Sequence, residues 1–327
     1  MSRTAAISGT GMAVPPKVLT NADLARMVET TDDWITSRTG IRERHVVEDG
    51  MATSDLGAGA GRMALAAAGL SAGDLDLILV ATITPDMLCP STACLVQAKL
   101  GAKKAAAVDL EAACSGFVYG LSLARGAIVS GEASNVLLIG AEVTSRFVDW
   151  TDRKTCVLFG DAAGAAVQQP SENGRGILGT VLGADGTGET LIMMPAGGSR
   201  EPASTETIAN KRHALQLKGQ DVFKSGVRSM TQAALDVLKK CGVDKRDVAL
   251  LVPHQANSRI IDAVGEAAGF PPEKIYQNVS RYGNTSAATI PVALHEAAAE
   301  GRLKRGDLAV VVAFGGGLTW GAALVRW

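Results

Sequence analysis

The sequence is poor in several features that would each point to a class of protein. It has five cysteines in 327 residues and no Cys-x-x-Cys pair, which argues against a disulfide scaffold or a structural zinc site. Sparse cysteine suits a reducing compartment, so we expect a cytoplasmic protein. The 32 basic residues are balanced by 33 acidic ones, and this lack of a basic excess makes a nucleic-acid partner unexpected.

Long charge-free segments are scarce too, and the one that approaches the length of a membrane span is interrupted. Residues 308–325 carry no charge, but three central glycines, 315–317, would each weaken a helix by roughly 1 kcal/mol relative to alanine. Two buried strands joined by a glycine turn explain the segment better. The N-terminus also lacks the basic start and apolar core of a signal peptide, so we expect no membrane attachment.

The composition that remains is that of a large globular protein. With 47% hydrophobic and 20% charged residues the chain is not intrinsically disordered, and its length suits two domains or one duplicated unit. Apolar runs at 75–82 and 136–142 predict short buried strands. Ser54 is expected to cap a helix that runs to about Ala68. This alternation of helix and strand predicts an α/β fold with mainly parallel strand pairing.

An internal repeat organises the chain. Residues 68–84 resemble 241–257, because each segment has a helix end, a glycine, an acidic turn and a buried strand. Residues 128–142 resemble 298–316 in the same way. We therefore predict two copies of one βαβ-rich unit.

The predicted halves are residues 1–172 and 173–327. Counting back from the glycines of the second pair of segments places Cys114, in the first half, opposite Asn284, in the second. His254 lies at the end of the repeated strand of the second half. Because open α/β sheets bind ligands at the carboxyl ends of their strands, these three side chains are expected to converge.

Each of the three residues suits catalysis, although each also has a simpler explanation. Cys114 begins an apolar helical run, and a position at the positive end of the helix dipole predicts a lowered thiol pKa and a nucleophile. A buried apolar cysteine, a structural histidine at His254 and a helix cap at Asn284 are the alternatives. A thiol, an imidazole and an amide together suit acyl-thioester chemistry, in which the last two donate hydrogen bonds to a forming enolate. A cysteine protease uses the same residue types, so the types alone leave both chemistries open.

Four segments carry these residues and their surroundings: EAACSGF (111–117), VPHQAN (252–257), YGNTSAA (282–288) and FGGGLTWG (314–321). Together they resemble the signatures of the β-ketoacyl-ACP synthase III family, the initiating condensing enzymes of type II fatty acid synthesis in the thiolase superfamily. Residues 32–45 and 152–165 are similar to further segments of that family, so the resemblance covers essentially the whole chain. It implies a thiolase-like, five-layered αβαβα fold built from two duplicated halves, a homodimer, no metal and no cofactor beyond the substrates.

The resemblance also implies a reaction. An acyl-CoA primer, acetyl-CoA or a longer or branched one, would condense with malonyl-ACP to give 3-oxoacyl-ACP, CoA and CO2. By motif, Cys114 would be the nucleophile, and His254 and Asn284 would bind the malonyl thioester carbonyl. Gly316 would supply an oxyanion N–H beside that of Cys114, and Phe314 would pack near the cysteine.

The same resemblance implies contacts for the two large substrates. Trp34 and Arg153 resemble the pair that sandwiches the CoA adenine, which is physically sensible because both side chains stack on a flat base. Arg38 resembles a CoA phosphate contact, and Asn257 would line the pantetheine tunnel. The implied docking residues for the acyl carrier protein are Arg259 and Lys224.

Two positions depart from the family pattern. Cys89 stands where acetyl-selective members carry a bulky aromatic residue, so a wider primer pocket is expected. Glu266 stands in a turn of the docking helix that is basic in some members, so weaker docking is expected.

Other condensing enzymes fit the sequence less well. A biosynthetic thiolase would carry a second cysteine near the glycine turn, and an elongating enzyme would carry a second histidine in place of Asn284. A non-catalytic subunit would usually lack the cysteine. A related Cys-His-Asn synthase of secondary metabolism, acting on another acceptor, keeps all the motifs and stays open as the alternative.

Overall fold

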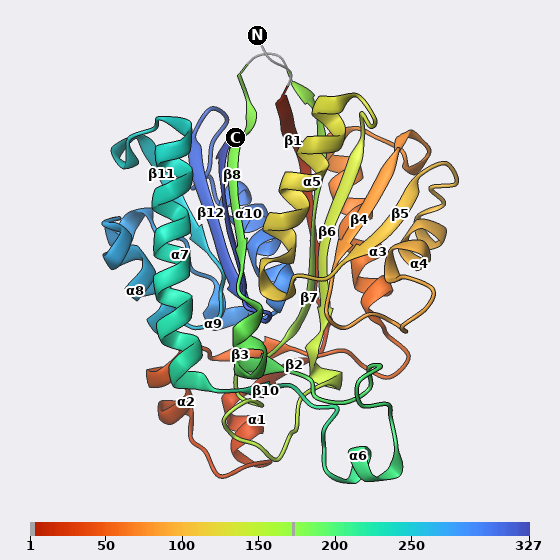
Figure 1. Ribbon diagram of the computed structural model, residues 1–327, viewed down its shortest axis with the longest axis vertical. Helices are drawn as coiled ribbons and strands as arrows, with labels where there is room; N and C mark the ends of the chain where they lie inside the picture. Colours follow the sequence, from red (N-terminus) through yellow and green to blue (C-terminus); the bar gives the residue numbers. More distant parts are fainter. Residues whose placement is uncertain (1–3, 172–173) are drawn as a thin grey trace.

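The structure is a computed structural model that describes residues 4–171 and 174–327. Two central sheets face each other, with helices between them and on both outer sides, as Figure 1 shows. This arrangement confirms the expected five-layered αβαβα fold. The first sheet contains, in spatial order, β1 (Thr4–Ala13), β7 (Asp161–Ser171), β6 (Val136–Val143), β4 (Leu77–Ala81) and β5 (Ala106–Leu110). The second contains β11 (Val248–Pro253), β12 (Leu308–Gly315), β13 (Thr319–Arg326) and β8 (Gly176–Ala184).

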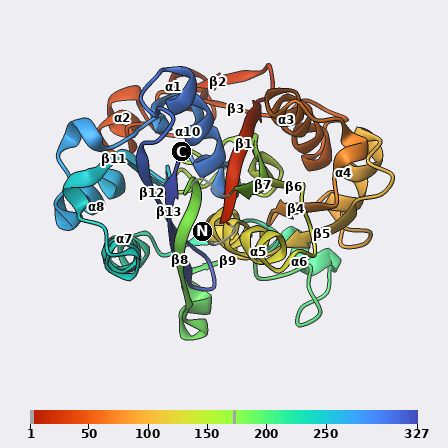
Figure 2. The same ribbon diagram turned by 90° about the horizontal axis from the view of Figure 1, so that it is seen from above.

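The main helices separate into a central layer and two outer layers (Figure 2). The central layer holds α5 (Gly116–Ser130) and α10 (Thr289–Ala299), which contact strands of both sheets. Seven of the eleven α10 residues are buried, as expected for a helix covered on two sides. The outer helices are α3 (Thr53–Ala68) and α4 (Thr92–Leu100) on the first sheet, and α7 (Gly219–Cys241) and α8 (Ser258–Ala268) on the second.

Shorter helices and strands surround the ends of the main strands, most of them in the lower part of Figure 1. They are β2 (Val18–Thr20), α1 (Asn21–Ala25), α2 (Asp32–Thr39), β3 (Glu43–His45), β9 (Ile192–Met193), α6 (Thr205–Ala209), β10 (Gln216–Leu217) and α9 (Val279–Tyr282).

The strands explain the charge-free runs of the sequence. All eight residues of β6 and all eight of β12 are buried, because helices cover both faces of each sheet. The segment 308–325 forms β12 and most of β13, which confirms the prediction of two strands joined at glycines. One other segment, 113–130, has the length and hydropathy of a membrane span, but half of that window is buried inside the molecule, as in a core helix.

The prediction of mainly parallel pairing is wrong. Parallel pairs are β4–β5, β4–β6 and β11–β12, whereas β1–β7, β6–β7, β12–β13 and β13–β8 are antiparallel. A parallel connection needs roughly a dozen residues or more, and the glycine turn between β12 and β13 is far shorter. The predicted glycine turn already required one antiparallel pair, and β1–β7, β6–β7 and β13–β8 add three more that the helix–strand alternation did not indicate.

Both sheets repeat one strand order. The order β1-β7-β6-β4-β5 corresponds to β8-β13-β12-β11, and an isolated bridge between Leu251 and Ile275 takes the place of the pairing of β5 with β4. The predicted boundary at residues 172 and 173 lies outside the described residues, between the end of β7 at Ser171 and the start of β8 at Gly176. The exact division into halves stays a prediction.

The repeat aligns the two helix starts differently from the sequence count. Both central helices follow a 3-10 turn, η2 (Ala113–Ser115) or η7 (Ser286–Ala288), whose first residue has a positive φ of 46° or 49°. This geometry pairs Cys114 with Ala287 and not with Asn284. The count failed because α5 has 15 residues and α10 has 11, so counting back from the helix ends misplaces the helix starts.

The predicted Ser54 cap is also wrong. The N-cap of α3 is Ala52, whose N–H donates to the Asp55 carboxylate at 3.0 Å. The Ser54 hydroxyl instead donates to Asp86 at 2.7 Å, because that carboxylate lies just beyond the helix start.

Candidate active site

Cys114 lies at the bend where β5 leads through η2 into α5. The hydroxyls of Ser115 and Thr319 donate to the Ala112 carbonyl at 2.7 and 2.9 Å, which fixes the bend. A Cβ at Gly315 would lie 2.6 Å from the Cys114 nitrogen, so only glycine permits this approach of β12. The end of β12 in the second sheet therefore packs against the bend that carries Cys114 at the end of the first sheet.

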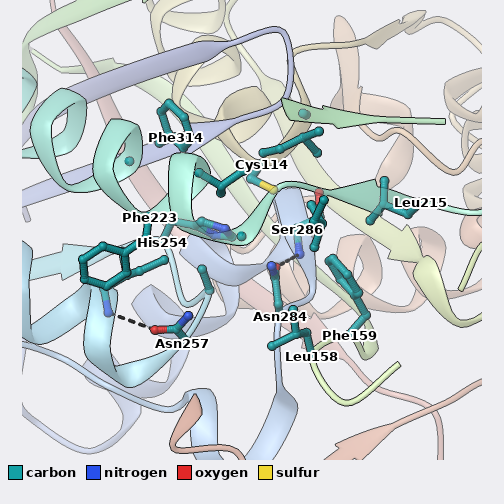
Figure 3. A pocket seen from close by; sticks show the side chains of 18 of the residues that line it. Cys114, Leu158, Phe159, Leu215, Phe223, His254, Asn257, Asn284, Ser286 and Phe314 are labelled. Carbon is teal, nitrogen blue, oxygen red and sulfur yellow. Dashed lines mark hydrogen bonds between the residues drawn. The ribbon is translucent and has the colours of Figure 1, made fainter. Parts of the chain in front are cut away.

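One cavity brings the predicted catalytic residues together (Figure 3). Cys114 enters it from the first half of the chain, and His254, Asn284 and Phe314 enter it from the second. The remaining walls are mostly apolar, including Leu158, Phe159, Leu215 and Met230.

The hydrogen bonds of His254 determine its tautomer. The ring is buried, and its Nδ1 lies 2.7 Å from the Thr289 hydroxyl. That hydroxyl donates its single hydrogen to the Ser286 carbonyl at 2.9 Å, so it must accept from Nδ1–H. Burial lowers the pKa of His254 to about 3, and the neutral ring therefore presents an unprotonated Nε2.

The orientation of the Asn284 side chain follows from similar reasoning. Its Oδ1 accepts from the backbone N–H of Ser286 at 2.9 Å, as the dashed line in Figure 3 shows. A backbone N–H can only donate, so the atom facing it is oxygen and the amide NH2 is left for the cavity. Asn284 is thus not the helix cap considered from sequence, since the N-cap of α10 is Ala288.

The same bonds separate the two chemistries that the residue types left open. A cysteine protease requires its asparagine to orient the histidine ring. Here Thr289 orients His254, and Asn284 is held by the backbone of Ser286. The imidazole and the amide are independent groups that both line the cavity, as thioester chemistry requires.

The expected low pKa of the thiol is not found. Burial raises the pKa of Cys114 to about 12, and the negative charge of Glu142 acts in the same direction, although interaction with the Ser286 side chain opposes them. Desolvation of the thiolate thus outweighs the helix-dipole effect on which the prediction depended. The thiol needs a proton acceptor, and Nε2 of His254 in the same cavity is suited to that task.

A second cavity adjoins the first beyond the Cys114 bend. Gly316 lines it, together with Leu88, Met193 and Met194. Four residues border both cavities: Ile83, Ala113, Ile192 and Leu215. Cys89 lines neither of them in the described chain and is exposed in the loop before α4. Its predicted pocket role stays a prediction.

An outer cavity connects the first cavity with solvent. The two share Gly219, Phe223 and Asn257 in their walls. The Asn257 side chain also caps α8 by accepting from Ile260 N at 2.9 Å (Figure 3). Three basic residues border this mouth: Arg38, Lys224 and Arg259. None of them takes part in an ion pair within residues 4–171 and 174–327.

Three of the four side chains expected to contact CoA, those of Trp34, Arg38 and Arg153, also form one cluster. The guanidinium of Arg38 lies 4.6 Å from the centroid of the Trp34 ring, and that of Arg153 lies 5.2 Å from it. A base between two flat groups needs about 7 Å, two carbon contact distances. Arg153, which also donates to the Glu29 carbonyl at 2.8 Å, must therefore move to admit an adenine.

Sequence reasoning missed the groups that orient the candidate catalytic residues. Ser286, Thr289 and Thr319 carry no catalytic signal by type, and their roles depend on partners far away in the chain. The one sequence signal near them is the series of small residues in the surrounding motifs, which indicates close packing. In the described part of the chain, no group of three or more His, Cys, Asp or Glu side chains is arranged to hold a metal ion.

Comparison with known proteins gives consistent matches. Residues 108–186 match the family model of 3-oxoacyl-[acyl-carrier-protein] synthase III, and residues 238–327 match that of its C-terminal part. The beta-ketoacyl-[acyl-carrier-protein] synthase III of Symbiobacterium thermophilum is 55% identical over 325 residues, 99% of this chain and 98% of that protein.

Solved structures agree. The 3-oxoacyl-[acyl-carrier-protein] synthase III of Aquifex aeolicus is 49% identical, with a TM-score of 0.92 over 99% of this chain and all of that one. The priming β-ketosynthase of the R1128 polyketide pathway has the same TM-score over 99% of this chain and 96% of its own, but only 32% identity.

Proposed function

Because this chain belongs to the β-ketoacyl-acyl-carrier-protein synthase III family, we propose that it condenses an acyl-CoA primer with malonyl-ACP in the reaction that starts fatty acid synthesis. The products are 3-oxoacyl-ACP, CoA and CO2. The observation that carries the proposal is that the Cys114 thiol, the unprotonated Nε2 of His254 and the NH2 of Asn284 line one cavity. Basic side chains border the outer cavity that leads to it. No cofactor is needed beyond the two thioesters.

In the first half-reaction, the Cys114 sulfur attacks the thioester carbonyl of acyl-CoA. His254 Nε2 takes the thiol proton and passes it to the departing CoA sulfur, so one C–S bond forms and one breaks. The N–H groups of Cys114 and Gly316 would stabilise the oxyanion, since β12 and the Cys114 bend are in close contact. Phe314 closes the apolar wall beside the thiol.

In the second half-reaction, malonyl-ACP loses CO2 and the resulting enolate attacks the acyl carbon on Cys114. The amide NH2 of Asn284 donates to the thioester oxygen as negative charge develops there. His254 contributes a second donor once a solvent proton has reached Nε2. When the new C–C bond forms and the C–S bond breaks, that proton passes to the Cys114 thiolate and restores the enzyme.

The charged and aromatic side chains along the channel suit both substrates. Arg38 at the mouth suits a CoA phosphate, and Trp34 with Arg153 suits the adenine. Arg259 and Lys224 suit the acidic carrier protein, and Asn257 lies at the junction where a pantetheine arm would pass. The secondary-metabolism alternative has less support, because the polyketide-priming relative is only 32% identical.

The acyl group would occupy the second cavity, beyond the Cys114 bend. Its apolar side chains suit primers longer than acetyl. Leu88 lines this cavity, which supports a role for its neighbour Cys89 in limiting primer length.

We further propose a cytoplasmic homodimer that pairs through the open edge of β5. This strand ends the first sheet, and Val108 at its centre is 45% exposed. The adjoining loop exposes 86% of Leu88, and exposed edges of this kind are usually covered in native proteins. Sedimentation of the wild type and of Val108→Lys tests this, and a monomeric wild type would contradict it.

The function is tested with labelled substrates. Acetyl-CoA labelled in the acetyl group should acylate Cys114, and addition of malonyl-ACP should chase the label into 3-oxobutyryl-ACP. Cys114→Ala should do neither, while Cys241→Ala, which alters a thiol outside the cavities around Cys114, should do both. A panel of acyl-CoAs in the same assay identifies the primers. Acylation of the wild type without condensation would contradict the proposal.

A further inference from the structure

A fully buried carboxylate, Glu142, lies behind the site and takes no part in the steps above. It stands near the end of β6 and is bound from both halves of the molecule. Its Oε2 accepts from the hydroxyls of Thr82 and Thr84 at 3.1 and 2.7 Å, and from Ile83 N at 3.1 Å. Its Oε1 accepts from the Ser286 hydroxyl at 2.9 Å.

Ser286 connects this carboxylate with the catalytic residues. Its N–H holds Asn284 Oδ1, and it lines the same cavity as the Cys114 thiol. Its φ of 49° is strained for a residue other than glycine and persists only where the surroundings hold it. The hydrogen bond to Glu142 is one of the contacts that hold it there.

Glu142 also lies one hydrogen bond behind Ser286, which is in the wall of the cavity that holds the thiol. Its negative charge disfavours the Cys114 thiolate. The carboxylate therefore affects the two catalytic residues in opposite ways, since it orders Asn284 through Ser286 and restrains ionisation of Cys114.

We propose that Glu142 is a positioning residue for the condensation half-reaction, which aims the Asn284 amide through Ser286 while restraining the Cys114 thiol. The first part rests on the proposed function. Loss of Glu142 should then harm decarboxylation and favour thiol reactivity. General damage to the fold would instead lower both, so the opposite signs identify the role.

The test is Glu142→Gln, which keeps the side-chain shape and removes the charge. Decarboxylation of malonyl-ACP by the acyl-enzyme should fall about tenfold or more in kcat, with KM within about twofold, because a transition-state donor is misaligned. Acyl transfer from acetyl-CoA should persist. Alkylation of Cys114 by iodoacetamide at pH 7.5, followed peptide by peptide, should become about threefold faster or more, because the thiolate fraction rises.

A matched control is Asp161→Asn. Asp161 is another fully buried carboxylate, and it binds the Ser145 hydroxyl and backbone N–H groups of Ser145 and Val47. None of these partners lines the cavity around Cys114. This variant should change both half-reactions in the same proportion and should not accelerate alkylation.

Ser286→Ala provides a second variant if Glu142→Gln does not fold. It removes the hydroxyl link and keeps the backbone N–H that holds Asn284, and it should lower decarboxylation more than acyl transfer. Equal losses in both half-reactions, slower alkylation, or the same pattern in Asp161→Asn would overturn the proposal. If the wild type condensed none of the substrates, the function would fail, whereas the alkylation rates would still test the coupling of Glu142 to Cys114.

Discussion

At the scale of single residues, hydrogen positions decide the chemistry. The Thr289 hydroxyl fixes the proton of His254 on Nδ1, and the Ser286 N–H fixes the oxygen of Asn284. These two bonds leave His254 Nε2 as a proton acceptor and the Asn284 NH2 as a hydrogen-bond donor, both on the wall of the cavity. The proposed first half-reaction uses the acceptor, and the second uses the amide donor together with a proton that His254 has taken up.

Removal of the amide should separate the half-reactions. In Asn284→Ala the enolate loses one donor, a loss of roughly 2.7–4 kcal/mol in comparable oxyanion holes, or a 10²–10³-fold slower reaction. Decarboxylation of malonyl-ACP should fall by that factor, and acylation of Cys114 should change little. Rapid-quench measurement of the two steps checks this, and parallel loss in a folded variant would contradict the assigned role.

Removal of the Thr289 hydroxyl should affect the other half-reaction. In Thr289→Val the Nδ1–H loses its buried acceptor, which costs about 1–3 kcal/mol and favours the tautomer with Nε2 protonated. Acylation of Cys114 by acetyl-CoA should slow about tenfold or more. Thr289→Ser keeps the hydroxyl and should stay near the wild type. An unchanged acylation rate in the valine variant would show that Nε2 does not take the thiol proton.

At the scale of secondary-structure elements, helix starts position the functional groups. The bend before α5 presents Cys114, and the start of α8 places Asn257 in the channel and Arg259 at its mouth. The exposed Glu266 lies two turns further along α8, near the same face as Arg259. This helix therefore presents opposite charges to an approaching partner.

Charge reversal on α8 should alter docking of the carrier protein. Arg259→Glu should raise KM for malonyl-ACP about tenfold at low salt, and Glu266→Lys should lower it, with both effects shrinking as salt rises. Among the described residues Arg259 forms no ion pair, and its neighbour Asp262 accepts instead from Gln277 Nε2 at 2.6 Å. Initial rates at two salt concentrations provide the measurement. An unchanged KM in Arg259→Glu would exclude a docking role.

At the scale of the whole molecule, burial between two sheets shifts two ionisable groups in opposite directions. Burial raises the pKa of Glu142 from 4.5 to about 7, so its contribution to stability is present at low pH and is lost as pH rises through 7. Burial lowers the pKa of His254 from 6.5 to about 3, so its contribution is lost as pH falls below 6.5. Between pH 4.5 and 6.5 the two groups therefore change the free energy of unfolding with pH in opposite directions.

Glu142→Gln should remove the contribution of Glu142 to the pH dependence of the free energy of unfolding. As pH falls from 6.5 to 5, the free energy of unfolding of the variant should decrease relative to that of the wild type by about 1.4 kcal/mol per pH unit. Urea unfolding at several pH values measures both proteins. Parallel pH dependences would mean that Glu142 titrates alike in the folded and unfolded chains.

The sequence by itself predicted the buried strands, and its resemblance to the synthase III family implied the five layers and the candidate reacting side chains. Apolar runs report burial on both faces, and small-residue motifs around Cys114, His254 and Asn284 report close approach. Both signals are local, so they survive without knowledge of the fold.

Only the tertiary structure decided the pairing directions, the thiol pKa and the groups that orient the candidate catalytic residues. The pKa of Cys114 depends on desolvation by elements from both halves, and the tautomer of His254 depends on a hydroxyl 35 residues away. Glu142 and Ser286 lie 144 residues apart and meet only because two sheets pack across the central helices. Such contacts depend on distances in space, which residue types and spacings do not encode.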